Sequence, residues 1–273
     1  MNTRKKLLTL LSVSSLGFLS LQTNAASTGT ISTTAGYSLT GTYGEFTLDT
    51  SNPTLDTSGY SALTKGVDGS ASSFQSFCLE RETAIGFGQT LQVVINTSAL
   101  PGGQGTGGTI GYDPISQGTA YLYKEFATGQ LSGYNYTDLT GGARSRAESA
   151  RDLQITIWAL ENEVDFDNTG NPVNPLSFIN PYYKELLDSE FGDGNGTLTA
   201  TEFATAKVNN DYSVYEVRAL NITDPLDVTD PNRQDQLYYG GPSLLPTPDA
   251  GSSLLLLGMA LGSIGFFQKR LKK

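Results

Sequence analysis

Cys78 is the only cysteine of the 273-residue chain, and it lies in the short apolar stretch at 77–79. One cysteine cannot form an internal disulfide, so any chemistry would rest on the thiol itself. Gln154 lies on the apolar stripe of an expected helix, together with Ala147, Ala150, Ile157 and Trp158. A thiol that faces a buried glutamine amide can displace ammonia and form an internal thioester. Such a bond could acylate an amine or hydroxyl on a partner.

The same two residues also have a purely structural interpretation. Cys78 would then be a small buried hydrophobe, and Gln154 would be a core amide whose hydrogen bonds are satisfied. In a strand, Phe77 and Leu79 point away from the face that carries Cys78, so this stretch alone does not decide which face is the core. Both interpretations stay open at this point.

A second candidate site is the segment FGDGNGTLTATE at 191–202, which resembles an EF-hand calcium loop from its third position onward. By that resemblance Asp193, Asn195 and Glu202 supply side-chain oxygens and Thr197 supplies a backbone oxygen. Phe191 occupies the first position, where the loop usually has Asp, and Asp188 or Glu190 would replace that ligand only with a distorted geometry. The alternative is a turn between two helices, in which Thr199 and Glu202 form a capping box.

Composition excludes several classes of function. The chain has no histidine, which removes Ser-His-Asp and Cys-His catalysis and makes a zinc centre unexpected. The chain has 17 basic and 27 acidic residues, and seven of the basic ones lie in its two ends. The part of the chain between the ends is therefore strongly acidic. An acidic body disfavours nucleic-acid binding. A polysaccharide hydrolase would need a pair of carboxylates, and no spacing singles one out. We therefore expect a protein that is not an enzyme.

The elements that would position these residues indicate an α+β fold. Short alternating runs between residues 27 and 115 predict strands, among them SFQSFCLE, and DYSVYEVRALNITD and QDQLYYGG predict further strands at the end of the body. Helices are expected from Ser116, in RSRAESARDLQITIWALENE, in INPYYKELLDSEF and in TATEFATAKV. The sequence predicts one domain at 27–245, a β-rich sandwich or barrel with a helical segment at about 116–208.

The two ends carry export signals. Residues 1–26 have a basic start, an apolar middle and small residues at Ala25 and Ala26, which is the order of a secretory signal peptide. Residues 246–273 contain TPDAGSS, a short apolar segment and a basic end. This tail resembles the PEP-CTERM-like sorting signals of exosortase systems, in the variant with Val-Pro-Asp-x-Gly-Ser, where this chain has Thr247 in place of Val. The resemblance assigns the motif to Pro248, Asp249 and Gly251.

That resemblance implies a partner and a location. An exosortase-like membrane protease would cut near the motif, after transient anchoring by the C-terminal helix, and pass the body to the cell surface or extracellular matrix. The apolar segment at 253–267 is short for a full membrane span, which needs ~20 residues. The alternative is a plain C-terminal membrane anchor.

The body resembles the thioester domains of bacterial surface proteins. FCL at 77–79 and LQITIW at 153–158 are similar to the two motifs of that family, with Leu153 in place of its Thr and Thr156 in place of its Ala. The family's middle Gln motif has no clear counterpart here. The resemblance implies a bond between Cys78 and Gln154, and a covalent adhesin whose thioester acylates amine- or hydroxyl-bearing surface or matrix ligands. The alternative function is an inert structural matrix protein with a buried free cysteine.

Overall fold

A computed structural model of the chain describes residues 28–40, 43–50, 55–81, 83–100, 113–140, 144–164, 174–226 and 233–240. The strands are β1 (Thr28–Thr40), β2 (Tyr43–Thr50), β3 (Ser73–Ser76), β4 (Thr90–Asn96), β5 (Ser98–Ala99), β6 (Asp113–Pro114), β7 (Val217–Thr223) and β8 (Gln236–Tyr239). The helices are α1 (Gln117–Ala127), α2 (Arg146–Leu160), the 3-10 turn η1 (Pro175–Ser177), α3 (Pro181–Phe191), α4 (Ala200–Ala206) and α5 (Tyr212–Tyr215). This arrangement confirms the predicted α+β class.

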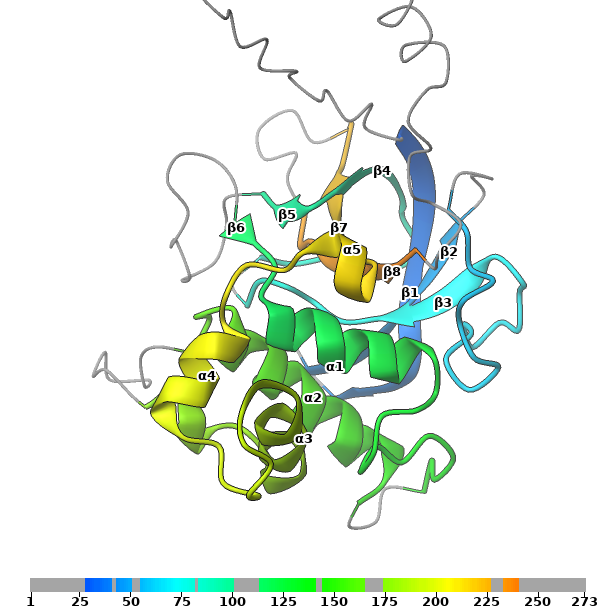
Figure 1. Cartoon of the computed structure of the whole chain (residues 1–273). Coiled ribbons are helices and arrows are strands. Elements are labelled where there is room, and N and C mark those ends of the chain that lie inside the picture. Colours follow the sequence, from blue (N-terminus) through cyan, green and yellow to red (C-terminus); the bar gives the residue numbers. More distant parts are fainter. Residues whose placement is uncertain are drawn as a thin grey trace, which may run out of the picture.

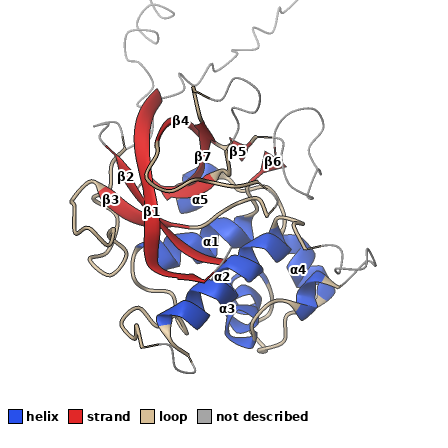
Figure 2. Ribbon diagram, turned by 180° about the vertical axis from the view of Figure 1, so that it is seen from behind, coloured by secondary structure: helices blue, strands red, loops and turns tan. Residues whose placement is uncertain are grey.

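The main sheet has six strands in the order β3-β2-β1-β4-β7-β8, and every neighbouring pair is antiparallel. Figures 1 and 2 show the strands on one side of the molecule and α1 to α4 gathered on the other. Helix α2 packs against β1 and β2, and α1 packs against β7 and β8. The core lies between these helices and the sheet, where most of the large apolar side chains are buried.

The two ends of the sheet meet. After β3, the chain runs along β8, and Leu79 N–H donates to the Asp235 carbonyl at 2.9 Å. Leu237 N–H donates to the Phe77 carbonyl at 3.1 Å, and Cys78 pairs with Gln236 in an antiparallel bridge. The sheet therefore curls back on itself, and its first and last strands are joined through residues 77–79.

One predicted strand begins later than expected. The alternating pattern predicts an extended chain from 211 to 224, but Tyr212–Tyr215 form the short helix α5. The Asp211 side chain accepts a hydrogen bond from Ser213 N–H and caps this turn. Glu216 then adopts a left-handed conformation with φ of 59°, which ends the turn and leads the chain into β7. The local capping by Asp211 overrides the alternating pattern.

Candidate functional site

Cys78 lies where the two ends of the sheet meet. Its residue is buried, and so are its neighbours Phe77 and Leu79; β8 adjoins this segment on one side, and the Gln154 side chain of α2 contacts its backbone on the other. The Phe77 ring packs edge-on against Phe126 of α1, with ring centroids 4.9 Å apart. Burial on both faces explains why the alternation at 77–79 could not identify a core side.

The Gln154 side chain contacts the backbone of Cys78. Cys78 N–H donates to Gln154 Oε1 at 3.0 Å, and Gln154 Nε2 donates to the Cys78 carbonyl at 2.8 Å. Helix α2 holds the amide in place, since its N-terminus is capped by Ser145 and its buried face packs under the sheet. The structure thus brings Cys78 and Gln154 together, but the hydrogen bonds join the Gln154 amide to the backbone of Cys78 and not to its sulfur.

The residue that contacts the sulfur is Gln236 of β8. Gln236 Nε2 lies 3.1 Å from Cys78 Sγ, and the two residues face each other across the antiparallel bridge. Gln236 is fully buried, and its Oε1 has no hydrogen-bond partner. Buried amide oxygens usually have a hydrogen-bond partner, but those of Gln75, Asn210 and Asn221 also have none, so it is the contact with the sulfur that distinguishes Gln236. The sequence offered a weak signal for this residue, a glutamine at the start of the predicted strand QDQLYYGG.

Two buried carboxylates, Glu80 and Asp235, lie beside the residues that follow Cys78. Glu80 Oε2 accepts a hydrogen bond from Asp235 N–H at 3.3 Å, and the Asp235 carboxylate accepts from Leu100 N–H at 2.6 Å and Asn221 Nδ2 at 2.7 Å. Burial raises the pKa of both Glu80 and Asp235, and the neighbouring negative charge raises that of Asp235 further. Burial also raises the pKa of the Cys78 thiol well above its ordinary value. At neutral pH the free thiol is therefore protonated.

The predicted calcium residues lie between α3 and α4. The structure brings Asp193 and Glu202 together with Asp188, and one carboxylate oxygen from each lies within 4.8 Å of the others. Asn195 N–H donates to Asp193 Oδ1 at 3.1 Å, and Thr197 N–H donates to Asn195 Oδ1 at 2.9 Å, so the loop is tightly wound. The capping box at Thr199 and Glu202 is also present.

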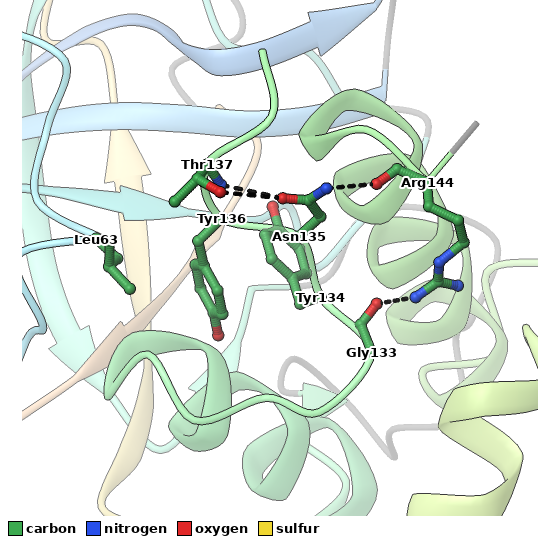
Figure 3. Close-up of a pocket in the computed structure, with 7 residues that line it drawn as sticks. All are labelled: Leu63, Gly133, Tyr134, Asn135, Tyr136, Thr137 and Arg144. Atoms are coloured by element: carbon green, nitrogen blue, oxygen red, sulfur yellow. Dashed lines mark hydrogen bonds between the residues drawn. The ribbon is translucent and has the colours of Figure 1, made fainter. Parts of the chain in front are cut away.

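A surface pocket of about 430 Å³ lies away from the cysteine and is lined by Leu63, Gly133, Tyr134, Asn135, Tyr136, Thr137 and Arg144. Figure 3 shows Asn135 between Thr137 and Arg144, and the Arg144 guanidinium donating to the Gly133 carbonyl. Arg146 holds two of the lining residues in place, because it donates hydrogen bonds to the carbonyls of Tyr136 and Leu63. It also forms a buried ion pair with Glu45 at 2.8 Å. Neither Cys78 nor the two glutamines line the pocket.

The predicted signal peptide and the sorting residues Pro248, Asp249 and Gly251 lie outside the described residues. Within the described part of the chain, no helix is long and apolar enough to cross a membrane. Comparison with known protein families, with curated proteins and with solved structures finds no match.

Proposed function

We propose that this chain is an exported surface or matrix protein whose Cys78 forms an internal thioester with Gln236. The observation that carries the proposal is the 3.1 Å contact between Cys78 Sγ and the Gln236 carboxamide, inside a fully buried site. Burial limits the access of water, which would otherwise hydrolyse an acyl sulfur bond. The signal peptide at 1–26 and the sorting signal at 246–273 support export through an exosortase-like system, as their sequence patterns suggest.

The bond would form by a balanced acyl transfer. Cys78 Sγ attacks Gln236 Cδ, the Cδ–Nε2 bond breaks, and Nε2 leaves as ammonia with the thiol proton. The product is a thioester, and no oxidant or cofactor is consumed. An amine of a ligand later attacks the same carbonyl, forms an amide with the Gln236 side chain and releases the Cys78 thiol. The reaction occurs once per molecule, so the protein is an adhesin rather than an enzyme.

Gln154 acts as a positioning residue in this scheme. Its amide holds both the N–H and the carbonyl of Cys78, which fixes the direction of the Cα–Cβ bond and keeps the sulfur on the side of β8. The bond between Cys78 and Gln154 that the family resemblance implied is the competing assignment. It would require the Gln154 carboxamide to release two backbone hydrogen bonds and turn toward the sulfur.

An inert matrix protein is the second candidate function. One observation favours it: burial raises the pKa of the Cys78 thiol, and a protonated thiol is a weak nucleophile. In that case Gln236 Nε2 is a hydrogen-bond donor to the sulfur, and Cys78 is a core residue with no chemistry.

The deciding experiment is the intact mass of the purified full-length chain, with and without methylamine. A thioester predicts a mass lower than the sequence mass by one ammonia, no free thiol after denaturation, and addition of one methylamine. Peptide mapping then distinguishes the two glutamines, because methylamine marks the acyl donor. We expect the label on Gln236; a label on Gln154 would restore the other assignment. A mass equal to the sequence mass, with one free thiol, would support the inert matrix protein.

A further inference from the structure

The junction of α3 and α4 gathers three carboxylates from different parts of the backbone. Asp188 lies in the last full turn of α3, Asp193 follows the end of that helix, and Glu202 is in the first turn of α4. One oxygen of each lies within 4.8 Å of the others. An acidic group of this kind is common on protein surfaces, so proximity alone does not define a site.

Asp188 separates this group from an ordinary surface cluster. Asp188 has an exposed fraction of 0 %, while Asp193 is exposed and Glu202 is half-buried. Asp188 Oδ2 accepts a hydrogen bond from Gly196 N–H at 2.6 Å, but Oδ1 is buried without a hydrogen-bond partner. Neither ion pair found among the described residues includes Asp188. A buried carboxylate oxygen without a donor is costly, and a bound cation would satisfy it.

The backbone leaves space beside this oxygen. A Cβ atom added at Gly192 would lie 2.6 Å from Asp188 Oδ1 and 2.7 Å from Glu202 Cδ, so only glycine keeps the volume between the two carboxylates open. The capping box accounts for Glu202 Oε2, which accepts from Thr199 N–H at 2.7 Å and from the Thr199 hydroxyl at 2.8 Å. The capping box accounts for neither the buried Asp188 oxygen nor the glycine.

We propose that Asp188, Asp193 and Glu202 bind one calcium ion, with Asp188 supplying the ligand that Phe191 cannot. Calcium binds oxygen ligands at about 2.3–2.6 Å, so two oxygens on opposite sides of the ion lie about 5 Å apart or less. The 4.8 Å limit fits that span. Magnesium demands near-ideal octahedral geometry and usually keeps several waters, so a site made of protein carboxylates suits calcium better. The site is independent of the proposed thioester and couples the ends of α3 and α4.

The test is calorimetric titration of the full-length chain with calcium chloride after treatment with a chelator, and in parallel with magnesium chloride. We expect one calcium per chain, with a Kd of about 0.1–1 mM as in extracellular modules, and a calcium-dependent rise in Tm. Asp188→Asn should weaken calcium binding by at least about tenfold, since the number of charged ligands sets the affinity. The matched control is Glu185→Gln, which changes an exposed carboxylate on the same helix and should bind calcium like the wild type.

A second variant keeps the proposal testable if Asp188→Asn does not fold. Gly192→Ala keeps all three carboxylates but places a methyl group against Asp188 Oδ1, and it should also weaken calcium binding. Circular dichroism confirms the folding of each variant. The proposal is overturned if the wild-type chain shows neither heat nor a Tm shift at about 10 mM calcium, well above the range for such sites. It is also overturned if the folded variants bind as tightly as the wild type.

Discussion

Replacing Gln154 with alanine tests whether this residue holds the backbone of Cys78 or donates the acyl group. The change removes two hydrogen bonds, of 3.0 and 2.8 Å, and leaves the N–H and carbonyl of Cys78 buried without partners. Each unsatisfied buried group costs about 1–3 kcal/mol, so the free energy of unfolding should fall by about 2–6 kcal/mol. For a domain of this size, each kcal/mol corresponds to about 2–4 °C in Tm.

The assay is urea unfolding followed by the fluorescence of Trp158, which is the only tryptophan of the chain and is 1 % exposed. The measurement is made in a Cys78→Ala background, where no thioester can form and only the backbone contact is tested. Gln130→Ala changes an exposed glutamine and serves as the matched control, with an expected effect within about 0.5 kcal/mol. With Cys78 present, the intact masses of Gln154→Ala and Gln236→Ala are compared.

The expected pattern is specific to the geometry. Gln236→Ala should restore the full sequence mass, since the acyl donor is gone. Gln154→Ala should be strongly destabilised and, in its folded fraction, still able to lose ammonia. If Gln154→Ala is as stable as the control, the amide does not hold the backbone and the structural argument for its role fails. If Gln154→Ala alone abolishes the mass deficit without loss of stability, Gln154 is the acyl donor.

Three further predictions follow from buried charges and from the tail. Burial raises the pKa of Glu161 from 4.5 to about 7, so the stability that this carboxyl contributes is present below pH 4.5 and is lost as the pH rises through 7. The Glu161→Gln variant should lack this change in the free energy of unfolding, which amounts to up to about 3 kcal/mol and can be measured by urea unfolding from pH 5 to 8. Arg146→Leu leaves Glu45 buried without its cation and should lower the free energy of unfolding by about 3–5 kcal/mol. Adding Glu45→Leu should restore much of this loss, and a double variant as unstable as Arg146→Leu would contradict the prediction. Changing Pro248 and Asp249 to alanine should leave the uncut chain in the membrane fraction of a host with an exosortase-like protease, detected by immunoblot; normal release would refute the sorting assignment.

Local patterns predicted the elements that carry Gln154 and the loop acids. The period of α2 placed Gln154 on a buried face, and the spacing of Thr199 and Glu202 predicted a helix start that the structure contains. These features depend on residues within one or two turns of each other, where propensity and capping decide the backbone.

The remaining features depend on contacts that no local pattern encodes. The contact of Gln236 with Cys78 exists because the last strand of the sheet lies beside the segment after β3, and strand order is set by packing of the whole domain. The EF-hand pattern predicts that Asp188 could replace the first loop ligand only with a distorted geometry, because Asp188 precedes the loop in the sequence. In the structure the end of α3 turns Asp188 inward, toward Asp193 and Glu202.

The ribosome makes Cys78 long before it makes the last strand, which closes the sheet. Cys78 and Gln236 are separated by 158 positions, and β8 is the final element of the described body. A chain that grows from its N-terminus therefore presents the thiol long before the residue that covers it exists. Residues 77–79 have no neighbour on that side until β8 has been made, so a prematurely terminated chain cannot complete the sheet. Any chemistry between the two side chains is thereby confined to molecules that have been synthesised through to the end of the body.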